Sequence, residues 1–367
     1  MITLILKVTD GCNLRCKYCS IGEKSDHFNI MNVDTMKSAG DFAVKLAKEK
    51  NDNNINIILH GGEPTIIRFT EYESFCEYLL KTYKDILFKF SLQTNGYHFT
   101  EDFISFLKKY DINVGVSIDG NEKVHDKSRV DINGNGTFDK IKQNIIKLIE
   151  NEICVSGLVV VTKDLLKEDL SYLNFFNYYD INLKINPLLN YGEATNDSSM
   201  WLECGDYSEY LKKVYLYMLE NEIEIQINPI SNMLSAIING SNMSDCAYKN
   251  ECGKNFICVD YKGDIYPCGR FYDVTGSCLG NIKNTNNVLK YESEELSDDC
   301  KQCKYMKWCY GGCNAYRKIM NANKTPLCDD IKNLFDYFSD EGIMEYINYL
   351  KEKKVYLKEK LKEIENA

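Results

Sequence analysis

Short runs of β-branched and aromatic residues alternate with longer amphipathic stretches through the first half of the chain. The runs have the length and composition of buried strands, and helical periodicity fills the intervals between them. Strands that alternate with helices predict βαβ units around a parallel sheet, either a partial (β/α)6 barrel or an open α/β sheet. The expected strands are residues 3–8, 55–60, 88–93, 114–118, 155–161 and 181–186. The expected helices are residues 33–50, 70–84, 100–110, 137–151 and 166–178.

The regular alternation ends at Pro187, and three segments of different character follow it. The first is polar, rich in Asn and partly helical, and we interpret it as a bridging segment. The second holds ten of the sixteen cysteines and one hairpin-like stretch, "FICVDYKGDIYPC". The third is charged and amphipathic, which predicts a capping helix or an oligomer contact. The four expected parts of the chain are residues 1–190, 191–245, 246–330 and 331–367.

Charge and targeting signals exclude several classes of protein. The chain has 44 basic and 54 acidic residues, and its net charge of −10 argues against a surface for nucleic acid or anionic membrane. The N-terminal sequence "MITLILKVTDG" has neither a basic stretch nor a long apolar segment. We therefore expect no signal peptide, no membrane span and a cytoplasmic location.

Sixteen cysteines are the unusual feature of the composition. In a reducing cytosol, clustered cysteines more often bind metal or carry redox chemistry than form disulfides. Two clusters stand out, at residues 12–19 and 246–328. Scattered cysteines usually act as small buried hydrophobic residues. We interpret four of them in this way: Cys76, Cys154, Cys204 and Cys278.

The first cluster, "CNLRCKYC", follows the first expected strand directly. Thiolates hold iron–sulfur clusters, and a four-iron cluster with three protein ligands keeps one iron open. Catalytic zinc sites also keep an open position, so Cys12, Cys16 and Cys19 indicate a reactive centre. The stretches "HGGEP", "QTNG" and "SIDG" lie at the ends of the next three strands. In a parallel barrel these strand ends share one rim, where functional residues gather.

A C-x3-C-x2-C loop after the first strand of an α/β barrel resembles the radical S-adenosylmethionine superfamily. The resemblance implies that Cys12, Cys16 and Cys19 hold a 4Fe–4S cluster whose open iron binds the methionine moiety of S-adenosylmethionine. One electron then cleaves the sulfonium, and the resulting 5′-deoxyadenosyl radical abstracts hydrogen from a substrate. Such chemistry belongs to the cofactor, and the protein places and shields it.

The same resemblance implies which residues contact S-adenosylmethionine. Glu63, in the family's GGE motif, would hold the ammonium group, and Arg129 would hold the carboxylate. Ser117 matches a position that contacts the ribose, whereas Val160 and Val161 would pack on the adenine. The family often has an aromatic residue after the third cysteine. Ser20 stands there instead, which weakens adenine stacking at that position. The expected cofactor contacts are Tyr18, Gly61, Gly62, Glu63, Gln93, Asn95, Ser117, Asp119, Arg129, Val160 and Val161.

The later cysteines are spaced C-x2-C-x5-C-x3-C-x14-C and, with "KGDIYPC", resemble the SPASM domain. The resemblance implies a partial (β/α)6 TIM-like barrel, a SPASM domain with two auxiliary 4Fe–4S clusters and a terminal helix. The first set of expected ligands is Cys300, Cys303, Cys309 and Cys328. The second set is Cys252, Cys268, Cys313 and either Cys246 or Cys258.

The sequence leaves two alternatives open: which cysteine is the eighth auxiliary ligand, and whether the metal is iron or zinc. Cys258 lies inside the apolar strand "FICV", and in sulfatase maturases the extra ligand lies upstream, so we favour Cys246. An open site there would instead indicate direct ligation by the substrate. A zinc ribbon would explain the "CKQC" pair alone. It would not explain eight cysteines interleaved across this segment behind a radical-type loop.

The resemblance extends from the first strand to Cys328 and covers the branch that modifies peptides and proteins. Sulfatase maturases carry an Asp base directly after the cysteine of "YPC", where this chain has Gly269. Asp273 is the nearest substitute. We therefore expect a peptide maturase that forms a thioether or carbon–carbon cross-link. The alternatives are formylglycine formation, epimerisation and a non-catalytic electron-transfer protein.

The expected partners are a peptide or protein substrate and a reductant of the flavodoxin or ferredoxin type. Many peptide maturases carry an N-terminal domain that recognises a leader peptide. Because this chain starts directly at the first strand, we expect a separate leader-recognition protein or recognition through residues 191–245.

Overall fold

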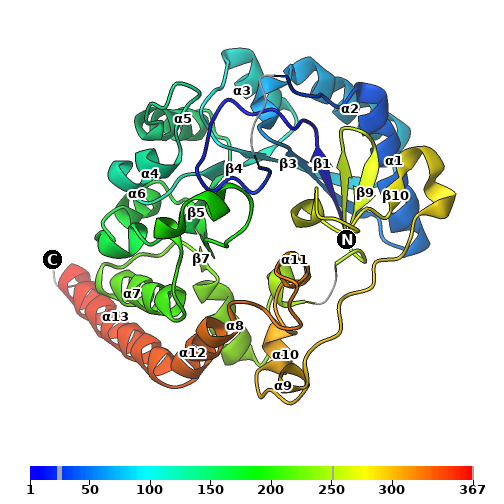
Figure 1. Cartoon of the computed structure of the whole chain (residues 1–367). Helices are drawn as coiled ribbons and strands as arrows, with labels where there is room; N and C mark the ends of the chain where they lie inside the picture. The colour runs from blue at the N-terminus through cyan, green and yellow to red at the C-terminus, as the bar shows by residue number, and fades with distance from the viewer. Residues whose placement is uncertain (23–26, 250–251, 366–367) are drawn as a thin grey trace.

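The computed structural model describes residues 1–22, 27–249 and 252–365. Its first six strands run parallel and in sequence order, as the alternating pattern predicts. Together they form one curved sheet (Figure 1). The strands are β1 (Ile2–Lys7), β2 (Asn54–His60), β3 (Leu87–Thr94), β4 (Asn113–Ser117), β5 (Val155–Val161) and β6 (Asn182–Pro187). The partial barrel predicted from sequence is confirmed.

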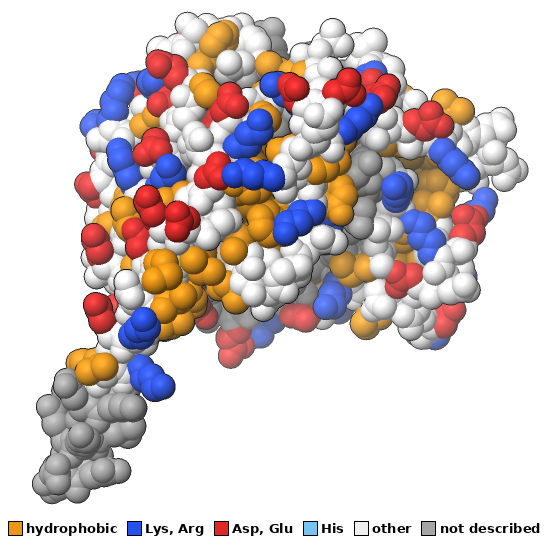
Figure 2. Space-filling view, turned by 90° about the horizontal axis from the view of Figure 1, so that it is seen from below, with side chains coloured by type: hydrophobic (Ala, Val, Ile, Leu, Met, Phe, Trp, Pro, Cys, Tyr) orange, Lys and Arg blue, Asp and Glu red, His pale blue; other side chains and the backbone are white. Residues whose placement is uncertain are grey.

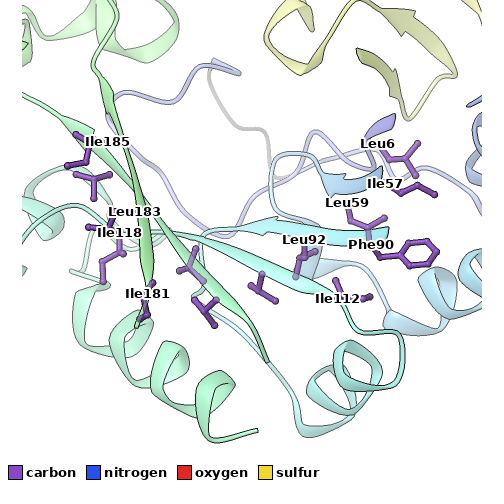
Figure 3. Packing of buried hydrophobic residues seen from close by; sticks show 14 of the residues in the cluster. Leu6, Ile57, Leu59, Phe90, Leu92, Ile112, Ile118, Ile181, Leu183 and Ile185 are labelled. Atoms are coloured by element: carbon purple, nitrogen blue, oxygen red, sulfur yellow. The ribbon is translucent and has the colours of Figure 1, made fainter. Parts of the chain in front are cut away.

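Helices cover the outer face of this sheet. The side chains that alternate along each strand, such as Leu6, Leu59 and Leu92, are buried between sheet and helices. Figure 3 shows such side chains from neighbouring strands packed together. The covering helices are α1 (Val33–Glu49), α2 (Phe69–Thr82), α3 (Glu101–Lys109), α4 (Glu122–Ser128), α5 (Phe138–Glu150) and α6 (Leu173–Tyr178).

Two of these helices differ from the prediction. The pattern gave no sign of α4, because this short, charged helix depends on a cap in which Asn121 accepts a hydrogen bond from the Val124 backbone. Conversely, the helix expected over 166–178 begins only at Leu173. Asp169 accepts the Ser171 backbone N–H at 2.8 Å, and this local turn competes with helical hydrogen bonding.

The sheet continues beyond the six expected strands. Across the described residues its order is β10-β9-β8-β1-β2-β3-β4-β5-β6-β7. The added strands are β7 (Ile227–Asn228), β8 (Phe256–Asp260), β9 (Asp264–Tyr266) and β10 (Gly280–Asn281). The hairpin predicted in the cysteine-rich segment is present as β8 and β9, and β8 pairs in parallel with β1. The sheet thus crosses the boundaries drawn from sequence, and the four-part division remains an expectation.

Helix α11 (Asn314–Ile319) lies across the opening between the two ends of the sheet (Figure 1). Its Tyr316 packs in a cluster with Cys258 of β8 and with Phe271. Tyr316 also lines a cavity with Lys184 and Ile185 of β6. The cysteine-rich segment therefore contacts both sides of the barrel opening.

The C-terminal tail forms two helices rather than the single helix predicted from residue 331. The break falls at Asp340, whose backbone is not helical (φ −125°, ψ −89°). Phe338 packs on Tyr215 with ring centroids 5.2 Å apart, which docks the first tail helix on α7. No helix in the described part of the chain is long and apolar enough to cross a membrane. The helices of this region are α7 (Asp206–Glu220), α8 (Ile230–Asn239), α12 (Cys328–Ser339) and α13 (Glu341–Glu365).

The scattered cysteines behave differently from one another. Cys76 is buried in the core, as predicted. Cys154, Cys204 and Cys278 are exposed, so the prediction for them is wrong. Cys154 precedes β5 in a loop, and Cys204 precedes α7, where its thiol faces Asp329 at 3.5 Å. Loop positions of this kind have no opposing helix to bury them.

Candidate active site

The polar rim predicted from sequence forms at the carboxyl ends of β1 to β4. Leu6, Leu59 and Leu92 point into the core, so the residues after them face the opposite side of the sheet. These inward residues are Lys7, His60 and Gln93. On β3 and β4, Gln93 Nε2 donates to Ser117 Oγ at 3.4 Å. The strand ends therefore line one lumen.

The glycine pair after β2 packs directly against the chain that leads into the cysteine loop. Gly62 N donates to Thr9 O at 2.7 Å, and Glu63 N donates to Gly11 O at 2.8 Å. A Cβ atom at Gly62 would lie 2.0 Å from Gly11 O, closer than atoms can approach. Glycine is required here because the two backbones touch. The contact places Glu63 beside Cys12.

The three cysteines of the loop are close enough to influence one another's ionisation. Burial raises the pKa of Cys12 to about 12, and Glu63, Cys16 and Cys19 contribute to this rise. Burial also raises the pKa of Cys16 to about 11, against the opposing effect of Arg129. Only thiolates coordinate metal, so these thiols need a bound cation to ionise at neutral pH.

The Glu63 carboxylate is buried and fixed by four hydrogen bonds. Its Oε1 accepts from the Thr65 backbone N–H, the Thr65 hydroxyl and the Thr94 hydroxyl, at 3.0, 2.8 and 2.6 Å. Its Oε2 accepts from Asn95 N at 2.7 Å. Asn95 in turn donates through Nδ2 to Asn13 Oδ1 at 2.8 Å. Burial raises the Glu63 pKa, and the hydrogen bonds oppose that rise.

Asp119, at the end of β4, connects three elements of the site. Its Oδ2 accepts from Arg129 Nε at 2.9 Å and from the Tyr18 hydroxyl, and its Oδ1 accepts from Val160 N at 2.8 Å. The Arg129 guanidinium lies 5.2 Å from the Tyr18 ring centroid and close enough to Cys16 to oppose the rise of its thiol pKa. Asp119 thus orients Arg129 and ties the cysteine loop to β5.

His125 and Thr137 complete this network, although the sequence did not point to either residue. Asp119 N donates to His125 Nδ1 at 3.1 Å, so the ring proton lies on Nε2, 3.0 Å from Thr137 Oγ1. Thr137 Oγ1 then donates to Arg129 O at 2.8 Å. Burial lowers the His125 pKa to about 4 and keeps the ring neutral. The only signal in the sequence was that His125 stands four residues before Arg129.

The structure does not bring every expected residue to the lumen. Val160 packs with Tyr18 beside a small cluster that includes Leu188. Val161 is buried in the core on the opposite face of β5, because neighbouring strand residues alternate sides. Packing of Val161 on adenine is therefore not supported. Asp273 is exposed in a turn with a φ of 62°.

Gly269 stands where sulfatase maturases carry an Asp, and its surroundings are apolar and cationic. A Cβ atom at this position would lie 3.4 Å from Ile5 Cγ2 and 3.5 Å from Lys7 Cε, both ordinary contacts. The Lys7 ammonium also lies 5.8 Å from the Tyr272 ring centroid. Gly269 therefore faces the aliphatic part of the Lys7 side chain and supplies no carboxylate.

The four later cysteines line one cavity of about 440 Å³, counted with the open space at its mouth. They come from α9 (Asp298–Lys301), α10 (Met306–Cys309), the turn between them and the first residue of α12. The lining cysteines are Cys300, Cys303, Cys309 and Cys328. Their convergence matches the ligand set expected for one auxiliary cluster.

Three of the other expected cysteines lie close to Arg270. Its guanidinium donates to Cys313 Sγ at 3.7 Å, and Tyr316, Cys246 and Cys268 lie near enough to raise the Arg270 pKa. Cys258 is buried in β8, where burial raises its thiol pKa, as expected for a packing role. Among the residues that the structure describes, no group of three His, Cys, Asp or Glu side chains is arranged to hold a single metal ion.

Comparisons with known proteins decide the family. Residues 6–175 match the sequence model of the Radical SAM superfamily. The chain belongs to the radical SAM superfamily. A cysteine-type anaerobic sulfatase-maturating enzyme of Clostridium novyi (strain NT) is 28% identical over 359 residues, covering 91% of this chain and 94% of that protein.

Two solved structures show how far the likeness to other radical SAM enzymes extends. "Native anSMEcpe with bound AdoMet and Cp18Cys peptide" matches with a TM-score of 0.78 and 27% identity, covering 94% of this chain and 98% of that chain. SuiB of Streptococcus suis bound to its precursor peptide SuiA matches with a TM-score of 0.60 and 16% identity, covering 88% and 73%. The second match shows the fold alone.

The residues present fit the cofactors of a radical SAM enzyme with a SPASM domain. S-adenosylmethionine and 4Fe–4S clusters are its cofactors, and thiol donors are supplied by the cysteine loop and by the cavity of α9, α10 and α12. Glu63 and Arg129 lie beside Cys12 and Cys16 respectively. Individual roles for these residues remain predictions.

Proposed function

We propose that this radical SAM enzyme is a maturase that forms an oxidative cross-link, either thioether or carbon–carbon, in a ribosomally made peptide. The observation that carries the proposal is Gly269. A glycine cannot take a proton, and the nearest side chains to it are Ile5 and Lys7. A lumen without a carboxylate at this position favours bond formation between two substrate groups over the carboxylate-assisted route to formylglycine.

The chain's own residues bind and shield the reacting groups. When bound, S-adenosylmethionine would supply a radical that removes one hydrogen atom from the substrate, and an auxiliary cluster would accept the second electron as a proton leaves to solvent. Glu63 and Arg129 hold its ammonium and carboxylate, and Asp119 orients Arg129 for that contact. Helix α11 contacts both sides of the barrel opening through Tyr316 and limits the entry of water.

Formylglycine formation is the second candidate function, because the relatives similar over nearly the whole chain are sulfatase-maturating enzymes. Asp273 would then have to act as the base, although it is exposed. Epimerisation and simple electron transfer have no comparable support. We further propose a flavodoxin- or ferredoxin-type reductant, a separate leader-recognition protein and a cytoplasmic location.

The product of an anaerobic reaction separates the two functions. The reconstituted enzyme is incubated with S-adenosylmethionine, dithionite and either a sulfatase-type Cys peptide or Cys-containing precursor peptides encoded beside its gene. Either cross-link predicts a precursor product that loses two hydrogen atoms and does not react with a hydrazide, and a thioether also removes the free thiol of the linked Cys. A hydrazide-reactive aldehyde on the sulfatase-type peptide, with no change in the precursors, would overturn the proposal.

A further inference from the structure

Arg270 lines a cavity of about 480 Å³, counted with the open space at its mouth, between β6, α11 and the loop before β8. Its Nη1 donates to Cys313 Sγ at 3.7 Å, and its guanidinium carbon lies 4.9 Å from the Tyr316 ring centroid. The aromatic face restricts where the guanidinium can lie. The structure thus holds a cation beside an expected ligand of the auxiliary cluster.

Two cations and one carboxylate line this cavity: Arg270, Lys184 and Asp245. Lys184, the second cation of the lining, is paired with Asp245 at 2.6 Å. Among the ion pairs of the described residues, none includes Arg270. A guanidinium remains protonated at every physiological pH, so its charge is permanent. The Asp245 carboxylate also acts on Arg270, so the lining keeps one net positive charge, beside Cys313.

A positive charge and a hydrogen bond to a ligating sulfur both stabilise the reduced state of an iron–sulfur cluster. Net charge, hydrogen bonds to the sulfurs and solvent exposure set its reduction potential. We propose that Arg270 is a positioning residue that raises the reduction potential of the auxiliary cluster held by Cys268 and Cys313. A raised potential makes this cluster a better electron acceptor. The inference concerns the cluster and not the peptide product, so it and the proposed function can fail independently.

The test is a redox titration followed by electron paramagnetic resonance. The parent is the holoprotein with Cys12→Ala, Cys16→Ala and Cys19→Ala, which leaves only the two auxiliary clusters to titrate. Arg270→Gln removes the charge, and Arg68→Gln is the matched control at an exposed Arg before α2. We expect Arg270→Gln to shift one midpoint potential to a more negative value and leave the other unchanged. The control should shift neither.

Unchanged potentials in Arg270→Gln, at the iron content of the parent, would overturn the inference. If that variant fails to load its cluster, Arg270→Met provides the second test, because methionine removes the charge and the hydrogen bond but keeps an unbranched side chain. One midpoint should again shift to a more negative value, and unchanged midpoints would overturn the inference.

Discussion

Asp119 has a structural role that its sequence motif, "SIDG", does not reveal. The family resemblance included it only among the cofactor contacts, but its hydrogen bonds with Tyr18, Arg129 and Val160 make it the link between separate elements. Those partners are far apart in sequence, so no local pattern could predict their convergence. By contrast, the GGE motif was predictable from sequence. A side chain at Gly62 would clash with the Gly11 backbone, so glycine is required there.

Asp119→Asn should weaken both stability and cofactor binding. The pair with Arg129 is buried, and removal of one charge leaves the other uncompensated, which costs about 3–5 kcal/mol. We expect a lower melting temperature and a Kd for S-adenosylmethionine raised more than tenfold. The matched control is Glu152→Gln, which breaks an exposed pair with Lys108 and should leave the melting temperature and the Kd nearly unchanged. Equal effects of the two changes would contradict this assignment.

Gly62→Ala should disrupt the cysteine loop. The added Cβ would meet Gly11 O at 2.0 Å, so the backbone that leads to Cys12 must move. We expect at least a tenfold loss of S-adenosylmethionine cleavage, about 1.4 kcal/mol, measured as 5′-deoxyadenosine. Gly269→Ala is the control, since its Cβ meets only ordinary contacts at 3.4 Å and beyond. A Gly62→Ala variant as active as this control would refute the steric argument.

His125 should make stability depend on pH. Its folded pKa of about 4 lies below the usual value of about 6.5. The neutral ring therefore stabilises the fold above pH ~6.5, and this contribution is lost as the pH falls toward 4. The full effect is about 3 kcal/mol. At pH ~7.5, His125→Asn should have a lower melting temperature than wild type. At pH ~5.5, this difference in melting temperature should be smaller. The same difference at both values would contradict the linkage.

At the scale of elements, periodicity predicted the six βα units but not where later strands join the sheet. Alternation of apolar residues indicates which face of a strand is buried, yet it carries no information about strand order. Pairing of β8 with β1 therefore appeared only in the structure. The break at Asp340 was missed for a related reason, because the charged tail keeps helical composition on both sides of it.

Phe338→Ala tests how α12 supports the auxiliary site. Phe338 is fully buried against Tyr215, and loss of such a side chain costs about 3–5 kcal/mol. Because Cys328 begins the same helix, we expect a lower melting temperature and faster loss of auxiliary iron to a chelator. Met344→Ala on α13, where the side chain is 51% exposed, is the control. Unchanged iron retention at reduced stability would show that the helix and the site are independent.

At the scale of the whole molecule, one continuous sheet connects the cysteine loop with the cysteine-rich segment. β8 lies beside β1, which leads into the loop, and β9 leads through Cys268 to Gly269 and Arg270. On the surface, acidic and basic side chains are interspersed over the face shown in Figure 2.

The central claim is that the three-cysteine loop is the reactive centre of this molecule. Anaerobically reconstituted wild type and the variant with Cys12→Ala, Cys16→Ala and Cys19→Ala are compared for 5′-deoxyadenosine formation and iron content. We predict 5′-deoxyadenosine with about twelve irons per chain for wild type, and none with about eight irons for the variant. Cleavage of S-adenosylmethionine by the variant would contradict the account.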